Sequence, residues 1–209
     1  MKQIIPFASY QEAIQAFDNG GKFFNLLSHA KDGVVTPAEL GKVAGVTFDR
    51  QEMILYLTMA ISHLDEHSKE RILAHLDEEL FELYEKHSPV HSTIAQLAKE
   101  PKAGFSTVLT GTPCKVSTSQ VFGGTIMIPV IVDAVTSFTI VPIVSAYEVY
   151  QMTCDKTGLK ATVAHHKEKS PLPEKKLKLG GVLTSLSGKD GQDPLDQVFL
   201  EVQYYIEEE

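Results

Sequence analysis

The segment QVFLEVQYYIE, residues 197–207, alternates apolar and polar side chains over almost its whole length. The even-numbered positions are apolar: Val198, Leu200, Val202, Tyr204 and Ile206. The polar side chains stand at odd-numbered positions: Glu201, Gln203 and Glu207. Successive side chains of a strand lie on opposite faces of a sheet, so this period of two predicts a half-buried β-strand.

The same kind of signal extends upstream through the C-terminal half of the chain. We expect further strands at residues 105–110, 115–122, 125–132, 138–152, 160–165 and 178–186. Glycine pairs at 123–124 and 180–181 punctuate these segments. Many short strands with frequent turn signals predict a small antiparallel β-barrel or sandwich.

Residues 126–149 require a separate test, because Asp133 and Glu148 are their only charged side chains. A membrane-spanning helix needs about 20 apolar residues. This segment is instead rich in Val, Ile and Thr, and Pro129 and Pro142 cannot donate to a sheet, which places them at edges or bulges. We therefore expect two strands with a turn at 133–137, and no membrane partner.

The first hundred residues have helical signals. Ser9, Thr36 and Asp49 each precede a glutamate by three residues, which is the spacing of a helix N-cap. Residues 69–87 form the clearest amphipathic pattern, with apolar side chains three or four residues apart. Pro101 and Gly104 mark the change of period. The sequence thus predicts an α+β chain, with an N-terminal helical bundle over 1–102 and a β-rich domain over 103–209.

Residues 24–40, FNLLSHAKDGVVTPAEL, resemble an EF-hand. Asp32 and the following glycine match its sharp turn, and Glu39 matches its terminal glutamate. Ser28 and Ala30 stand where that family has Asp or Asn. Calcium takes six to eight oxygen ligands, so the resemblance implies a degenerate, EF-hand-like loop without a cation. A partner loop is expected at 65–71.

The same region also fits a helix-turn-helix, with a first helix at 36–45 and a second at 48–61. A recognition helix must expose polar groups to DNA, whereas the second segment is apolar on all sides and is better interpreted as a buried central helix. The net charge is −8, and Arg50 and Arg71 are the only arginines. We therefore expect no nucleic-acid partner. The choice between the EF-hand-like and helix-turn-helix-like geometries stays open.

His63 and His67 are four residues apart, a spacing that metal ligands use on a helix. They are our candidate metal ligands, and His75, His87 or His91 could supply a third; ordinary surface histidines are the competing interpretation. Cys114 and Cys154 form no CxxC motif, which favours two free thiols and a cytoplasmic location.

The sequence contains no motif of a catalytic site. The nucleophile elbow G-x-S-x-G, the dinucleotide glycine fingerprint and the phosphate loop are all missing. We expect no catalytic residue and no cofactor. The prediction is a non-enzymatic cytoplasmic interaction or regulatory protein that binds a protein partner or itself through the 69–87 helix and an exposed strand at 198–206. The alternatives are a small-ligand or metal-binding protein that uses the barrel or the histidine pair, and a helix-turn-helix regulator.

Overall fold

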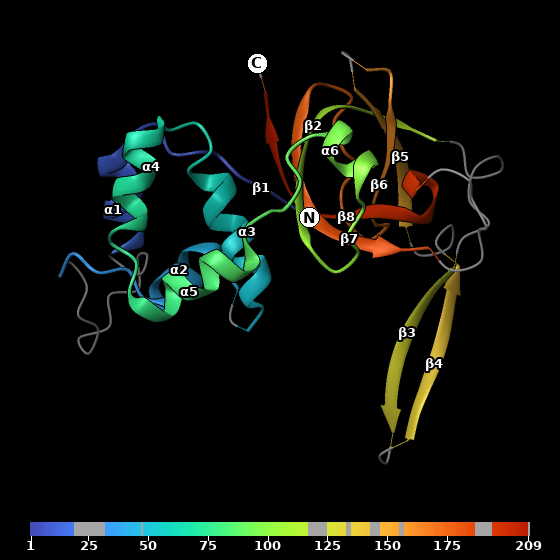
Figure 1. The fold of residues 1–209 in the computed structure, drawn as a ribbon, viewed down its shortest axis with the longest axis horizontal. Helices are drawn as coiled ribbons and strands as arrows, with labels where there is room; N and C mark the ends of the chain where they lie inside the picture. The colour runs from blue at the N-terminus through green and yellow to red at the C-terminus, as the bar shows by residue number, and fades with distance from the viewer. Residues whose placement is uncertain are drawn as a thin grey trace. The chain divides into compact units, whose positions relative to one another are not determined.

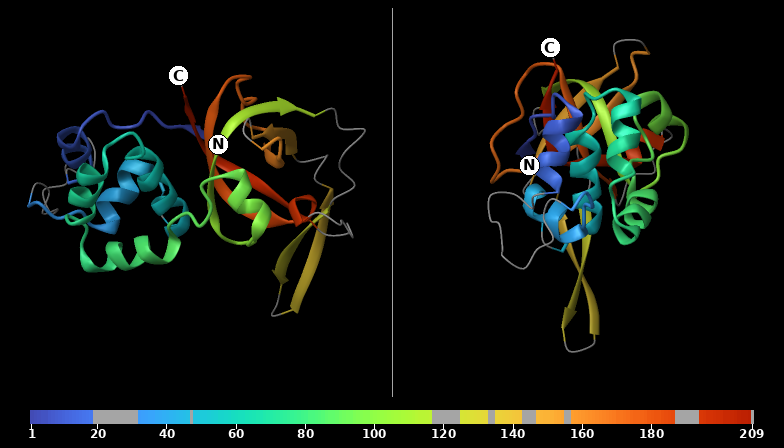
Figure 2. Two further views of the ribbon diagram at one scale, coloured as in Figure 1. Left: turned by 45° about the horizontal axis from the view of Figure 1, so that its top comes forward. Right: turned by 90° about the vertical axis from the view of Figure 1, so that its left-hand side faces the viewer.

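The computed structural model describes residues 1–18, 32–46, 48–116, 125–132, 135–142, 147–154, 157–186 and 194–208. The chain is α+β, as predicted, and forms two compact units (Figures 1 and 2). The helical unit is Gln3–Pro89, and the strand unit is Met1–Lys2 with Val90–Glu209. The boundary that we predicted at 102/103 stays a prediction. Within the described residues, no helix has the length and apolar character needed to span a bilayer.

The helical unit contains α1 (Tyr10–Phe17), α2 (Pro37–Ala44), α3 (Arg50–Ala60), α4 (Glu66–Leu73) and α5 (Glu78–His87). The three predicted caps are confirmed, because Ser9, Thr36 and Asp49 each accept the backbone N–H three residues ahead. Helix α3 is buried along most of its length, as expected of a central helix. Its buried side chains are Met53, Ile54, Leu55, Leu57, Met59 and Ala60.

The prediction of one amphipathic helix over 69–87 is wrong, because α4 and α5 are separate helices. The backbone between them pairs with Val35 instead: Val35 N–H donates to the His75 carbonyl at 2.7 Å, and Asp77 N–H donates to the Val35 carbonyl at 3.0 Å. The Asp77 side chain then caps α5 by accepting the Leu80 N–H at 2.7 Å. A long-range bridge and a new N-cap therefore end the helix where side-chain periodicity alone would continue it.

The strand unit contains α6 and a six-stranded sheet. Its elements are α6 (Ile94–Lys99), β2 (Ser106–Lys115), β5 (Tyr147–Thr153), β6 (Lys160–His166), β7 (Leu177–Ser185), the short 3₁₀ helix η1 (Pro194–Gln197) and β8 (Val198–Glu207). Strand β1 (Lys2–Gln3) joins the sheet at the boundary between the two units. The strand order is β1-β8-β6-β5-β2-β7, and β8 also pairs with β7. The sheet is mixed rather than purely antiparallel as predicted, because β6 and β8 run parallel.

Two strand predictions need correction. The first expected segment, 105–110, is part of the longer strand β2, which runs to residue 115. Residues 117–122 of the second segment, 115–122, lie outside the described residues. The predicted strand 138–152 is divided between β4 (Val135–Pro142) and β5. Gly181 lies inside β7, as the predicted strand 178–186 implies, and marks a register shift against β8. A side chain at Gly181 would collide with the Glu201 carbonyl oxygen, so this close approach requires glycine.

Strand β8 is an internal strand, so the expected exposed contact surface at 198–206 is wrong. It pairs along its length with β7 and also with β6 and β1. Its apolar side chains Val198, Leu200 and Val202 pack in the main core of the unit, together with Ile94 and Leu97 of α6. The alternation was correctly identified, but pairing partners on both sides cover the strand.

Strands β3 (Thr125–Val132) and β4 form a separate two-stranded antiparallel sheet. Their register runs without a break from Thr125 opposite Pro142 to Val132 opposite Val135. The prediction of two strands here, instead of one membrane span, is confirmed, but the turn predicted at 133–137 is too long, because β4 already begins at Val135. Both strands of a two-stranded sheet are edge strands, as Pro129 and Pro142 require.

Candidate functional site

Four polar side chains meet where β2 ends and β5 begins; we call them the strand-end cluster: Lys115, Glu148, Tyr150 and His165. Strand pairing brings them together, since Lys115 lies opposite Tyr150 and Glu148 lies opposite His165. Tyr150 and His165 are each only 1% exposed. Buried polar groups of this kind must satisfy one another by hydrogen bonds.

Hydrogen bonds connect Lys115, Glu148 and Tyr150 within the strand-end cluster. Lys115 Nζ donates to Glu148 Oε1 at 2.9 Å, and Tyr150 Oη donates to Glu148 Oε2 at 2.8 Å. The backbone N–H of Leu172 donates to Tyr150 Oη at 3.1 Å. The His165 ring stacks on Tyr150, and its Nδ1 lies 2.9 Å from the His166 carbonyl, which places the proton of the neutral ring on Nδ1.

The pKa values in this cluster move away from neutral pH. Hydrogen bonds from Lys115 and Tyr150 lower the pKa of Glu148. Burial, followed by the hydrogen bond to Glu148, raises the pKa of Tyr150 to about 12. Burial also lowers the pKa of His165. General acid–base catalysis works best with a pKa near the operating pH, so these shifts favour a structural role.

A second set of the same residue types lies on the opposite face of β5 and β6. Tyr147 Oη donates to Glu201 Oε1 at 3.2 Å, and His166 Nε2 lies 3.5 Å from the same oxygen. The Tyr147 ring also contacts His166 and Phe199, with ring centroids 4.4 and 5.8 Å away. Burial and the Glu201 carboxylate raise the pKa of Tyr147. This set likewise holds the Tyr147 phenol in its protonated form.

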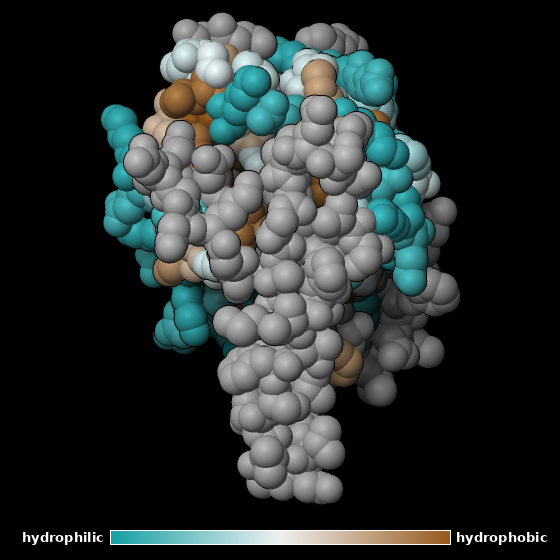
Figure 3. All heavy atoms as spheres, turned by 90° about the vertical axis from the view of Figure 1, so that its right-hand side faces the viewer, coloured by the Kyte–Doolittle hydropathy of each residue, from teal (hydrophilic) through white to brown (hydrophobic). Residues whose placement is uncertain are grey.

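The helical unit carries an open groove of about 370 Å³ between α2 and α3, which we call the α2–α3 groove. Its lining residues are Pro37, Ala38, Val46, Phe48, Asp49, Arg50, Met53 and Glu79. Phe48 is 93% exposed, whereas Val46 and Met53 are buried. On the side of the molecule drawn in Figure 3, by contrast, the described surface is mostly hydrophilic.

Local sequence determines the shape of this groove. Pro37 starts α2 and Gly45 ends it in the left-handed conformation, with a φ of 68°. Val46 N–H then donates to the Gly41 carbonyl at 2.9 Å, and this hydrogen bond holds Val46 against the end of α2. On the far side, the Arg50 guanidinium pairs with Glu79 of α5 at 3.2 Å.

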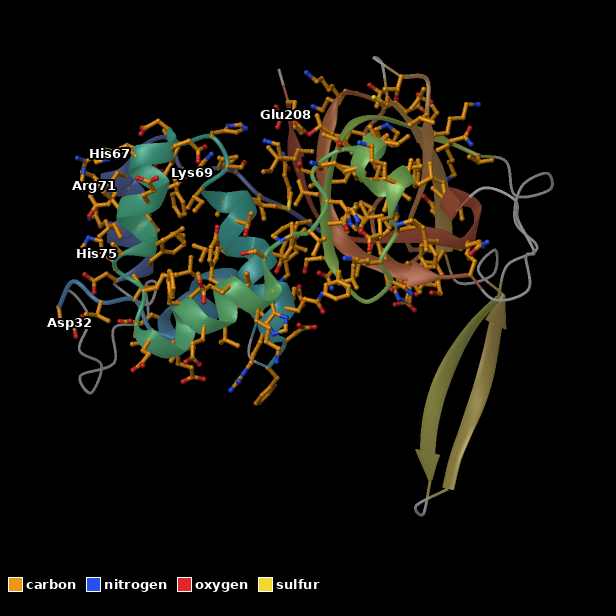
Figure 4. The ribbon with its side chains drawn as sticks, viewed as in Figure 1. Asp32, His67, Lys69, Arg71, His75 and Glu208 are labelled. Atoms are coloured by element: carbon orange, nitrogen blue, oxygen red, sulfur yellow. The ribbon has the colours of Figure 1, made fainter. Side chains whose placement is uncertain are left out.

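The predicted metal ligands lie on different elements. His63 is in the turn that follows α3, and His67 is on α4 (Figure 4). Both are exposed. Among the described residues, no three His, Cys, Asp or Glu side chains gather as a metal site would require. The pair itself stays a prediction, without a described third ligand.

The EF-hand-like residues have other partners. Glu39 accepts the Thr36 N–H at 3.0 Å and the Thr36 hydroxyl at 2.8 Å, so its carboxylate completes a capping box. Asp32 Oδ1 accepts the Val34 N–H at 2.9 Å. Ser28 and Ala30 lie outside the described residues. The partner loop predicted at 65–71 is wrong, because residues 66–73 form α4; the segment that pairs with Val35 is the turn after it.

Sequence reasoning missed both the strand-end cluster and Phe48. Glu148 and Tyr150 are two residues apart and therefore share a strand face, which was the available signal. Nothing local predicts that Lys115 and His165 come from neighbouring strands. Phe48 lies in a segment expected to be helical and buried, whereas α3 begins only at Arg50.

Comparison with protein families and with curated proteins finds no match for this chain. The functional interpretation therefore depends on geometry and charge. Of the described features, the strand-end cluster is internally satisfied, whereas the α2–α3 groove presents an apolar side chain to solvent. The groove is thus the better candidate for a binding site. Cys114 and Cys154 form no disulfide.

Proposed function

We propose that this chain is a non-enzymatic interaction protein whose helical unit binds a basic, amphipathic segment of a protein partner in the α2–α3 groove. The observation that carries the proposal is Phe48, which lines the groove beside four other apolar side chains and is nevertheless 93% exposed. A large aromatic side chain gains more from burial against a partner than any other exposed group of this surface.

The chemistry of the groove defines the complementary side chain. The lining includes the apolar side chains of Pro37, Ala38, Val46 and Met53, of which Val46 and Met53 are buried. A Leu, Met or Phe side chain would bury its surface there without leaving a polar group unsatisfied. Such an anchor, repeated at helical spacing, is typical of amphipathic helices that bind grooves.

Charge favours a basic partner. Residues 3–89 carry seven basic and fourteen acidic side chains, a net charge of −7. Asp49 and Glu79 lie at the groove itself, where Arg50 is the only cation of the lining. Charge complementarity accelerates association and selects among partners, and the same field would repel nucleic acid.

Phe48→Ala tests this proposal. The probe is a 20-residue amphipathic helix of Leu and Lys, and its affinity for the full chain is measured by fluorescence anisotropy at 0.15 M salt. We expect Phe48→Ala to weaken binding about tenfold, in the range of an interface hot spot. Phe81→Ala is the matched control, since Phe81 is 41% exposed on α5 outside the groove lining.

Two outcomes would overturn the proposal. Equal affinity of wild type and Phe48→Ala would show that the aromatic side chain makes no contact. Equal binding of a Ser/Lys peptide of the same charge would show that only electrostatic attraction operates. A salt titration separates the two contributions, because screening removes attraction between exposed charges but not apolar burial.

We also propose that the strand unit is a scaffold in which β2, β5, β6, β7 and β8 close into a small barrel. The support is that β8 pairs with both β6 and β7. The pairings therefore run from β8 through β6, β5, β2 and β7 back to β8. A cytoplasmic location is part of the same proposal, since Cys114 is an exposed thiol and a reducing compartment preserves such thiols.

A further inference from the structure

Strands β3 and β4 carry no ionisable side chain in their sixteen residues. Their residues are mainly apolar, and an isolated two-stranded sheet is marginal in water, so this element needs a partner.

The prolines determine which edge of the hairpin is open. Pro129 lies opposite Phe138 and has no N–H, so this pair cannot exchange hydrogen bonds. Hydrogen-bonded and non-hydrogen-bonded pairs alternate in an antiparallel ladder. Residues of the same parity as Pro129 therefore direct their backbone groups to the outer edges: Thr125, Met127 and Ile131 on β3, and Thr136, Phe138, Ile140 and Pro142 on β4.

The two outer edges differ in their donors. The β3 edge loses a donor at Pro129, in the middle of the strand. The β4 edge keeps three successive donors, at Thr136, Phe138 and Ile140, and loses one only at Pro142, its last residue. An uninterrupted edge accepts another strand, whereas an edge proline blocks it.

We propose that the β4 edge pairs with β4 of a second copy of this chain, antiparallel about a two-fold axis at Phe138. Thr136 would lie opposite Ile140 of the partner subunit, so every donor on one edge meets an acceptor on the other. The sheet becomes β3-β4-β4-β3 across the two copies, and no like charges face each other. Pro129 on both outer edges stops further addition, which closes the assembly at a dimer.

The test uses two proline substitutions at the same level of the hairpin. Met127 and Ile140 lie opposite each other, and both direct their N–H groups outward. Ile140→Pro removes a donor from the β4 edge, whereas Met127→Pro removes one from the β3 edge. By sedimentation velocity of the full chain, we expect a dimer for wild type and Met127→Pro, and at least tenfold weaker dimerisation for Ile140→Pro.

Cysteine cross-linking provides a second measurement that does not depend on how the proline variants fold. In a Cys114→Ser, Cys154→Ser background, Phe138→Cys would lie about 5.5 Å from its copy between Cα atoms, within disulfide range. Oxidation should then yield a covalent dimer, and Ile128→Cys should not.

A monomeric wild type, an open-ended polymer, or equal effects of the two prolines would overturn the proposal. This readout is independent of Phe48, so its failure leaves the groove proposal standing, and the reverse holds as well.

Discussion

At His165, burial and hydrogen bonding act on one ring. Its Nδ1 is held by the His166 carbonyl, and its other nitrogen lies 3.8 Å from Glu148 Oε2. Burial is the largest influence and lowers the pKa of His165 in spite of the nearby carboxylate. The folded state therefore resists protonation of this ring, while the unfolded chain does not.

This difference predicts acid sensitivity. Below the ordinary histidine pKa of about 6.5, the unfolded state binds a proton that folded His165 does not, so the free energy of unfolding falls as the pH falls. Urea unfolding at pH 7.5, 6.5 and 5.5 measures the slope. His87, whose pKa burial also lowers, contributes in the same direction, so the informative comparison is His165→Gln. That variant should have a smaller slope than wild type; an unchanged slope would contradict the assignment.

Tyr150 is the residue on which the strand-end cluster depends. Tyr150→Phe keeps the ring but leaves Glu148 Oε2 and the Leu172 N–H each without this partner. We expect the free energy of unfolding to fall by about 1–3 kcal/mol, the cost of unsatisfied buried groups. Spectrophotometric titration should also lose one phenol that ionises with a pKa near 12. Tyr84→Phe on α5 serves as the control and should cost much less.

At the scale of elements, local signals were reliable and long-range ones were not. Ser9, Thr36 and Asp49 were predictable as caps because a cap acts over three residues. The strand alternation of residues 198–207 was predictable for the same reason. The break between α4 and α5 depends on backbone pairing with Val35, some forty residues away. The parallel pairing of β6 with β8 depends on the path that the chain takes through β7 between these two strands. No local pattern encodes either.

Gly181 provides a prediction for an element. Gly181→Ala would place a side chain against the Glu201 carbonyl at the point where the register of β7 and β8 shifts. We expect a loss of about 1–3 kcal/mol in unfolding free energy, as for overpacked sites. Chemical denaturation measures it, with Thr184→Ala on the same strand as control. Equal stability of the two variants would mean that the bulge accommodates a side chain.

For the whole molecule, the sequence predicted the α+β class but not the candidate site. The groove combines α2, the segment before α3 and one residue of α5, and only tertiary packing brings Glu79 to Arg50. The strand-end cluster likewise requires three strands. In both cases no single residue marks the site in the sequence, because the site forms only when residues distant in sequence come together.

The chain divides into two compact units, which predicts two unfolding transitions. Thr36→Ala removes the α2 cap and should cost about 1 kcal/mol in the helical unit alone. Tyr150→Phe should shift only the transition of the strand unit. Differential scanning calorimetry of both variants checks this. If either substitution moves both transitions together, the units unfold as one cooperative body.

The pairing of β1 with β8 has a consequence for synthesis on the ribosome. Lys2 and Gln3 are synthesised well before their sheet partner, which spans residues 198–207. The helical unit can fold as soon as α5 emerges, whereas the sheet must wait for β8. While the residues between β1 and β8 are being added, β1 and the unfinished sheet edges are exposed together. Slow synthesis of this stretch would therefore favour aggregation of the nascent chain through its strands, not its helices.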